Sequence, residues 1–317
     1  MSYVIIGYIS GLLFLLSPAL LLNFIGVLVF SHSMVIAAYL LHECAHNSIF
    51  RKNKLHRWLG EVLLWICGAS YSNYDDVRFK HVRHHTDKGD VVSFDYRKVI
   101  KNYPVLLKII VTLEWLFIPA VEIMMHLLVI ILPFIKKAER KHRRPRIVIM
   151  LILRFAFFLS LAQISLKILL LYPLSYMIFL IVMRFMDAHQ HTYVLFETLD
   201  SPRGPEAKQF DREFEQNNTY SNLLSIKHPW LNLLVLNFSY HNAHHQQPGC
   251  PWYHLPELHK TLYGDKRERV LSMKALLKNY YRHRQGRVLN EDKINIPVKH
   301  NEENFIGVDG VSFLTTH

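Results

Sequence analysis

Two long stretches of the chain contain few or no charged residues. The first runs from Tyr3 to Leu41 without any Asp, Glu, Lys or Arg. The second runs from Ile147 to Met186 and has a polar break near residues 167–173. Each is about twice the roughly 20 residues that a helix needs to cross a bilayer. We therefore predict two transmembrane hairpins, the first turning near Leu22 and Asn23, with four spans at about residues 3–22, 24–41, 147–166 and 170–186.

A third apolar region, residues 104–134, is too short for two spans and carries Lys108, Glu114 and Glu122. A single span here would move the basic run that follows it to the other side of the membrane. We therefore interpret the region as a pair of interfacial or re-entrant helices. The predicted fold is an all-α membrane protein with one integral-membrane domain over residues 1–285, which includes a cytoplasmic cap at about 190–285, and a polar C-terminal tail at 286–317.

The charge distribution indicates an orientation in the membrane. Half of the residues are apolar, yet the net charge is +12. Four basic residues at positions 51–57 follow the first hairpin, and the run KKAERKHRRPR, residues 136–146, precedes the second. The positive-inside rule places both on the cytoplasmic side, although a solvated linker would have a similar composition. Arg154 and Arg184 are expected near the ends of the second hairpin, where long basic side chains reach the headgroups.

Other compositional features exclude two classes of protein. The three cysteines form no pairable framework, which argues against a disulfide scaffold and favours a reducing setting. The basic residues follow the ends of the membrane segments and form no compact basic and aromatic face, so we do not expect nucleic-acid binding.

Histidine is abundant and clustered. The chain has 20 histidines, many of them in HECAH (42–46), HVRHH (81–85), DAHQH (187–191) and HNAHH (241–245). On a helix, residues at i, i+3 and i+4 share one face, so each H-x-x-H-H motif can direct three rings at one centre. A chain of this histidine content is expected to contain about 0.08 such motifs by chance, and it contains two. Under the predicted topology all four clusters lie on one side of the membrane.

The clusters indicate a metal site, and their number favours two ions. HECAH fits H-E-x-x-H, the zinc-protease signature, in which two histidines bind zinc and the glutamate is the general base. A catalytic zinc takes only three protein ligands, so this reading leaves most of the clustered histidines without a role. Imidazole binds iron, copper, nickel and zinc alike. A zinc protease and a non-catalytic metal-binding membrane protein therefore remain the alternatives to a dimetal enzyme.

These motifs resemble the membrane fatty acid desaturase superfamily, which includes related hydroxylases, acetylenases and terminal-alkene-forming enzymes. The resemblance covers roughly residues 30–265: HECAH, HVRHH and HNAHH are similar to its three histidine boxes, and NFSYHNAHHQQPGCPWYHLPELH resembles the surroundings of the third. It implies two iron ions bound by His42, His46, His81, His84, His85, His191, His241, His244 and His245.

The resemblance also implies roles for nearby residues. Asp187 and His191 match an N-x-x-x-H pattern of the superfamily, with aspartate in place of the asparagine that reaches the metal through water. Asp187 is therefore expected as a second-sphere or water-mediated partner, and a carboxylate can also bind iron directly. Glu43 is expected to orient a neighbouring imidazole, with an exposed structural glutamate as the alternative. His189 ranks below His191 as a ligand.

The resemblance further implies O2-dependent oxidation of a lipid. The expected reaction introduces a double bond into a long acyl chain, with hydroxylation, acetylenic-bond formation or decarboxylation to a terminal alkene as alternatives on the same scaffold. The chain has no H-P-G-G haem motif and no cysteine cluster for an iron–sulfur centre. A separate electron donor is therefore expected, namely a ferredoxin, a rubredoxin or a cytochrome b5 with its reductase. The expected location is the bacterial inner membrane or the endoplasmic reticulum.

Overall fold

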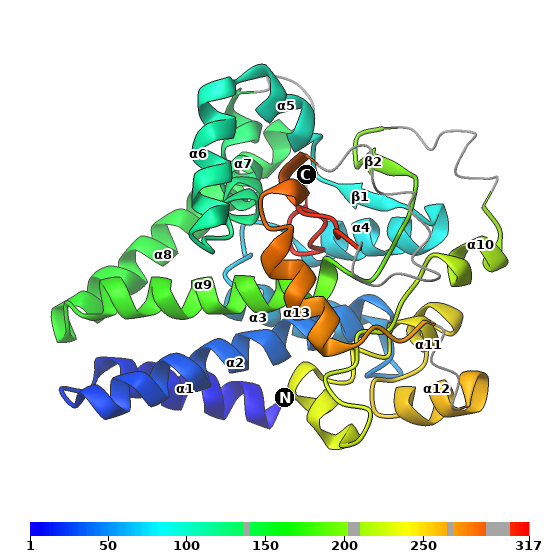
Figure 1. Ribbon diagram of the computed structural model, residues 1–317. Coiled ribbons are helices and arrows are strands. Elements are labelled where there is room, and N and C mark those ends of the chain that lie inside the picture. Colours follow the sequence, from blue (N-terminus) through cyan, green and yellow to red (C-terminus); the bar gives the residue numbers. More distant parts are fainter. Residues whose placement is uncertain (136–139, 202–209, 265–268, 290–304, 317) are drawn as a thin grey trace.

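The computed structural model describes residues 1–135, 140–201, 210–264, 269–289 and 305–316, and most of them are helical (Figure 1). The expected basic run, cap and tail therefore fall partly outside the described residues. The helices in chain order are α1 Ser2–Leu16, α2 Leu20–Ala45, α3 Asn53–Ile66, α4 Tyr74–Asp87, α5 Tyr96–Asn102, α6 Pro104–Trp115, α7 Ala120–Ile135, α8 Arg144–Ile164, α9 Ile168–Asp187, α10 Arg212–Asn217, α11 His241–Gln246, α12 Leu255–Tyr263 and α13 Met273–Arg282.

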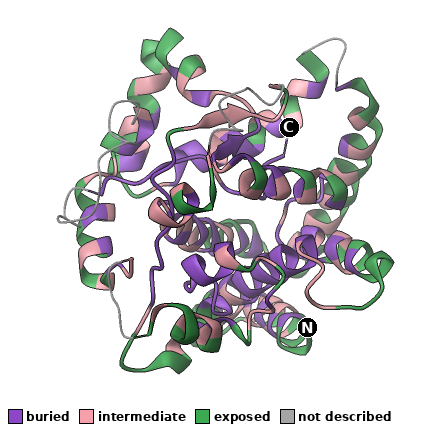
Figure 2. Ribbon diagram, turned by 90° about the vertical axis from the view of Figure 1, so that its right-hand side faces the viewer, coloured by how far each residue is buried: buried purple, intermediate pink, exposed green. Residues whose placement is uncertain are grey.

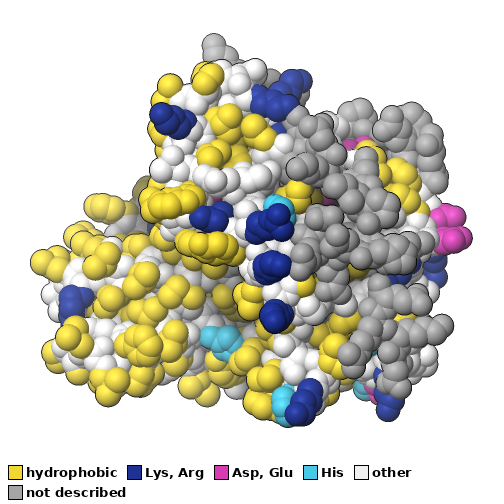
Figure 3. Space-filling view, in the orientation of Figure 1, with side chains coloured by type: hydrophobic (Ala, Val, Ile, Leu, Met, Phe, Trp, Pro, Cys, Tyr) yellow, Lys and Arg dark blue, Asp and Glu magenta, His cyan; other side chains and the backbone are white. Residues whose placement is uncertain are grey.

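Three of the described helices are long and apolar enough to cross a membrane. They are α2, α8 together with the short turn that precedes it, and α9. The apolar helix α1 has 15 residues, and at 1.5 Å per residue it spans only about 22 Å of a hydrocarbon core about 30 Å thick. Apolar side chains cover the surface of the end of the molecule that contains α1, α2, α8 and α9 (Figure 3). The four-span topology remains a prediction.

The first hairpin turns earlier than the sequence predicted. The turn occupies residues 17–19, and Asn23 lies in the first turn of α2. The Asn23 side-chain amide donates hydrogen bonds to the carbonyl oxygens of Phe14 (2.8 Å), Leu15 (3.2 Å) and Ser17 (2.9 Å). The last carbonyls of a helix have no partner within it, so this asparagine completes the end of α1. Asn23 therefore lies next to the turn, in the first turn of α2, and is not part of the turn itself.

Residues 104–134 form two helices, as expected, with a break between them. The chain changes direction at Phe117, whose φ is +62°, between α6 and α7. With α5 these helices form a separate lobe (Figure 1). Their position relative to a membrane surface remains a prediction.

A small sheet departs from the predicted all-α fold. Strand β1, Asp90–Val92, pairs in parallel with β2, Phe196–Thr198. The first strand follows the HVRHH helix α4 and the second follows His191, so their pairing holds two histidine-bearing segments side by side. Three-residue strands give no periodic signal in a sequence, which explains why the pattern did not predict them.

Part of the expected polar tail lies inside the molecule. Residues 305–316 are almost entirely buried, including Phe305, Phe313 and Leu314. They run through the interior, where they contact α4, α5 and α9 (Figure 1), and buried residues gather in this interior (Figure 2). This contradicts the expected tail over these residues. The reason is electrostatic as well as apolar, because a buried ion pair neutralises Asp309.

That ion pair also corrects the expected role of Arg184. Its guanidinium binds both carboxylate oxygens of Glu114 (2.8 and 2.6 Å) and both of Asp309 (2.8 and 2.5 Å). All three side chains are at most 4% exposed, so Arg184 does not reach towards headgroups. Arg154 lies midway along α8 and not near its end. The Arg184 network joins α9, α6 and the C-terminal segment.

The Arg184→Ala variant should be strongly destabilised. It leaves buried Glu114 without its counter-ion and leaves Asp309 with Arg287 alone, whose Nε lies 3.4 Å from Asp309 Oδ1, and breaking a buried ion pair in this way costs about 3–5 kcal/mol. The measurement is the apparent Tm of the purified protein in detergent. Arg57→Ala is the control, because the Arg57–Asp75 pair is more than half exposed and such pairs contribute about 0–1 kcal/mol. Equal Tm values for the two variants would contradict the assigned role of Arg184.

Candidate metal centre

The clustered histidines meet in two adjacent groups. The ligand atoms of each group lie within 4.8 Å of one another. The first group contains five histidines and the second four. They are His42, His46, His81, His85 and His244 in the first, and His84, His191, His241 and His245 in the second. All nine histidines that the sequence nominated are therefore brought together.

Helix ends position these rings. His42 and His46 lie at the end of α2, HVRHH lies in the second half of α4, and HNAHH forms most of α11. The Asn73 side chain caps α4 by accepting the Asp76 N–H at 2.8 Å. The Tyr74 hydroxyl at the start of α4 donates to the Cys44 carbonyl at the end of α2. These bonds hold the first two histidine segments against each other.

Within each group the Nε2 atoms point at one another. In the first group they lie 2.6 Å apart for His46 and His81, and 3.2 Å apart for His81 and His85. In the second group His191 Nε2 lies 3.1 Å from His84 Nε2 and 2.8 Å from His241 Nε2. Both ring nitrogens of His42 and Nε2 of His245 are buried without a hydrogen-bond partner among the described residues. Convergent lone pairs and unpartnered buried nitrogens fit bound metal ions.

Burial keeps these rings in the form that binds metal. It lowers the pKa of His84 to about 4, and the neighbouring imidazoles add to the effect of burial elsewhere. The pKa is lowered well below its ordinary value for His46, His81, His85, His191, His241, His244 and His245. These rings are therefore neutral near pH 7, and a neutral imidazole is the species that coordinates a metal.

The Nδ1 atoms of three rings contact residues outside the two histidine groups. His84 Nδ1 lies 2.8 Å from the Gly89 carbonyl oxygen, and His191 Nδ1 lies 3.3 Å from Thr219 Oγ1. His245 Nδ1 lies 2.8 Å from Glu215 Oε1. Such contacts fix the ring orientation and leave Nε2 free to bind a metal.

Glu215 is a site residue that the sequence did not reveal. It is 7% exposed, and one of its carboxylate oxygens lies within 4.8 Å of ring nitrogens of His85 and His245. Burial raises its pKa to about 7, against the opposing effect of Lys88 and Arg212. Its position on the short helix α10, with no histidine nearby in the sequence, gives no local signal. Only the fold brings it beside HNAHH.

The other nominated residues lie around the two groups. Asp187 ends α9 and lines a cavity beside them, but it belongs to neither group. Glu43 is buried, and its Oε1 lies 3.7 Å from His42 Nδ1. Its Oε2 accepts hydrogen bonds from Ser48 Oγ (2.7 Å) and the Trp252 N–H (3.1 Å), so the alternative of an exposed glutamate is wrong. His189 lies outside both groups and packs against the Phe305 ring.

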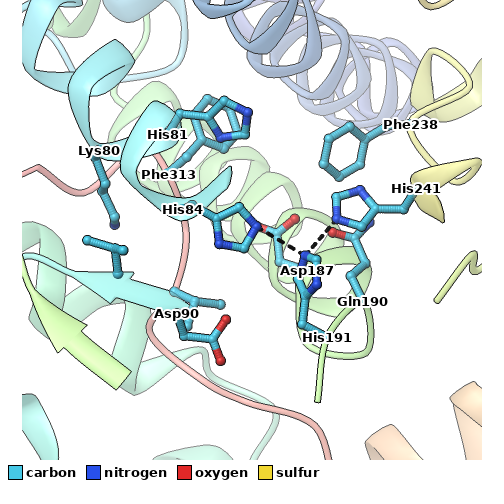
Figure 4. A pocket seen from close by; sticks show the side chains of 12 residues that line it. Lys80, His81, His84, Asp90, Asp187, Gln190, His191, Phe238, His241 and Phe313 are labelled. Atoms are coloured by element: carbon cyan, nitrogen blue, oxygen red, sulfur yellow. Dashed lines mark hydrogen bonds between the residues drawn. The ribbon is translucent and has the colours of Figure 1, made fainter. Parts of the chain in front are cut away.

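A small cavity opens between the histidine groups, with room for about 50 Å³. Figure 4 shows His84 and His241 facing His191 across it, with Phe238 and Phe313 on its walls. Lys80 and Asp90 also line it, and burial lowers the pKa of Lys80 to about 7 and raises that of Asp90 to about 7. One water molecule needs roughly 10–15 Å³ of such space, so the cavity suits a few waters or one small molecule.

Comparison with known proteins agrees with this geometry. The family model described as fatty acid desaturase matches residues 18–276, a range that includes all four histidine segments. No curated protein and no solved structure gave a significant match. A match over most of the chain, together with two convergent histidine groups, confirms the resemblance: the chain belongs to the fatty acid desaturase family.

Proposed function

We propose that this protein is a membrane di-iron oxidoreductase that uses O2 to introduce a double bond into a long acyl chain. Membership of the family indicates an oxidoreductase of the desaturase or hydroxylase type acting on lipid. The observation that carries the more specific proposal is the division of nine buried histidines into groups of five and four. That division matches two ions, because one ion cannot use nine ligands.

The two groups would each hold one iron ion through their Nε2 atoms. When bound, the two ions supply the chemistry that activates O2 and removes hydrogen from an unactivated C–H bond. The chain's own residues hold neutral imidazoles in place and keep bulk water away. Glu215, Thr219 and the Gly89 carbonyl orient three of the rings. Asp187 is assigned a second-sphere or water-mediated role, and Glu43 the orientation of His42.

An apolar cavity supports a lipid substrate. It lies between α7, α8 and α9, offers about 440 Å³, and is lined mainly by aliphatic and aromatic side chains, including Ile130, Leu151, Phe158 and Leu180. Pockets that bind organic ligands commonly have about 300–1,000 Å³. We assign the acyl chain to the membrane side of the protein and place the histidine groups on the cytoplasmic side. Electrons would come from a separate ferredoxin, rubredoxin or cytochrome b5.

The zinc-protease alternative fits less well. In that mechanism Glu43 would activate a water as general base. Its Oε2 instead accepts two hydrogen bonds, from Ser48 and Trp252, and His42 and His46 share their group with three further histidines. Hydroxylation, acetylenic-bond formation and alkene formation would use the same ligands, and the product distinguishes them.

Expression in cells with a compatible reductant should yield an oxidised acyl product, measured by mass spectrometry of lipids, free acids and headspace volatiles. We expect a product that lacks two hydrogens. His244→Ala should abolish it, whereas His254→Ala, which alters an exposed histidine, should leave it unchanged. A product with one added oxygen, or a volatile alkene one carbon shorter, would replace desaturation by a sister activity. Iron-loaded protein that forms no oxidised product would contradict the proposal.

The purified protein should contain two iron ions per chain, and Glu215→Gln should weaken iron binding. Loss of a carboxylate that orients a metal-binding histidine lowers metal affinity by about 10–100-fold. The measurement is iron retained per protein after graded exposure to a chelator. Glu213→Gln is the matched control, because Glu213 is exposed on the same helix. Equal retention in the two variants would show that Glu215 does not support the site.

A further inference from the structure

We propose that the C-terminal segment, Phe305–Thr316, forms one wall of the catalytic cavity, and that Phe313 determines which part of the acyl chain reaches the metal centre. This inference rests on the proposed function, because it assumes that an acyl chain is oxidised beside the two histidine groups. It goes further by assigning selectivity to a residue about 70 positions beyond the third histidine motif, outside the matched range 18–276.

Phe313 lies against the first histidine group. The centroid of its ring is 6.0 Å from that of His42 and 6.0 Å from that of His81. It also lines the small cavity that touches His84, His191 and His241 of the second group. Any molecule that enters this cavity to face both groups therefore lies close to the Phe313 ring.

A second phenyl ring defines another wall. The Phe238 centroid lies 4.8 Å from that of His42 and 5.0 Å from that of His241. Figure 4 shows Phe238 and Phe313 on different sides of the cavity. Two apolar rings beside the four imidazoles that line the cavity suit one short segment of a hydrocarbon chain, which gains from apolar contact and needs no hydrogen bonds. With room for only about 50 Å³, the cavity is sensitive to the size of these rings.

Lys80 anchors the segment on both sides of Phe313. Its buried ammonium donates to the Ser312 carbonyl (2.5 Å), the Thr315 carbonyl (2.7 Å) and Thr315 Oγ1 (3.3 Å). The Thr316 hydroxyl donates to Ser72 Oγ at 2.7 Å. In its protonated form the group has three donors, one for each of these oxygens. The backbone that carries Phe313 is therefore fixed next to α4, the helix that bears HVRHH.

Asp309 anchors the segment a second time. Its carboxylate binds Arg184, and its carbonyl oxygen accepts the Tyr96 hydroxyl at 2.8 Å. Gly310 follows with φ +72°, and a Cβ there would lie 2.6 Å from the Tyr96 ring. Only glycine accepts both the left-handed backbone and this close approach. Two buried polar anchors on either side of Phe313 make a rigid wall, and rigid walls are what discriminate between substrates of different length.

The test compares two phenylalanines of the same segment. Phe313 is 7% exposed and Phe305 is 6% exposed, but Phe305 packs against His189 and Tyr220, away from the cavity. Cells expressing the wild type, Phe313→Ala or Phe305→Ala receive saturated fatty acids of even length from lauric to stearic acid. Products are identified by chain length and by the carbon attacked, and iron content and Tm are measured on the purified proteins. Phe313→Leu replaces Phe313→Ala if the latter does not fold.

We expect Phe313→Ala to change the ratio of products from neighbouring chain lengths, or from neighbouring carbons, by about tenfold or more, which is the usual effect of misfitting a methylene group. Iron content should match that of Phe305→Ala, and Phe305→Ala should keep the wild-type ratio. Wild-type product ratios in Phe313→Ala would overturn the wall and leave the proposed function intact.

If the wild type oxidises no fatty acid, that result counts against the proposed function. A binding measurement then tests the proposed wall separately. Displacement of doxyl-labelled stearate from the purified proteins by the same series of acids then gives a length profile. A profile that changes in Phe313→Ala but not in Phe305→Ala supports the wall. Profiles that stay equal to the wild type in both variants, or absence of displaceable binding in the wild type, contradict it.

Discussion

The convergence of nine imidazole rings in the interior constrains the rest of this structure. A ring that gained a second proton would carry a positive charge among eight other imidazole rings. Burial of such an unpaired charge is very costly. Burial lowers the pKa of eight of these rings, which therefore stay neutral near pH 7. Nε2 lone pairs that face one another this closely are unfavourable alone, and a metal cation between them would offset that cost. The elements around them serve this arrangement: the parallel β1–β2 pair joins the segments of HVRHH and His191.

The elements that matter most for the site were predictable from the sequence because their signal is local. Stretches with few or no charged residues predicted the apolar helices, and the i, i+3, i+4 spacing predicted three histidines on one face of α4 and of α11. The turn was predicted too late in the chain because Asn23 was taken as part of it. A polar residue between apolar runs is equally suited to cap the end of a neighbouring helix. The sheet, Glu215 and the C-terminal segment were missed for another reason. Each depends on contacts between segments far apart in the chain, such as Glu215 with His245 and Asp309 with Arg184.

The Arg184 network explains why the C-terminal segment lies inside. The sequence around it, NFIGVDGVSFL, is apolar but contains an aspartate, and an aspartate in a short run is usually read as a sign of exposure. Here Arg184 carries the opposite charge, although the apolar sequence of α9 around it offers no sign of its partner. Burial of either charge alone would be unfavourable, but the two charges neutralise each other and can be buried together. The same reasoning covers Glu114, which looked out of place in an apolar region and completes the network from α6.

The ligand set and the walls of the site have different tasks. Desaturation, hydroxylation and alkene formation all begin with removal of one hydrogen and would use the same nine histidines, so these rings cannot determine the product. What distinguishes the outcomes is which carbon is presented and what surrounds it after the first hydrogen is lost. In the proposed site those properties would depend on the residues that line the cavity, which include Phe238, Phe313, Asp187 and Lys80. Lys80 holds the segment that carries Phe313, and it directly precedes His81, a proposed metal ligand, on α4. The proposed wall and this helix are therefore mechanically joined. A shift of the C-terminal segment would therefore alter the position of substrate and ligands together.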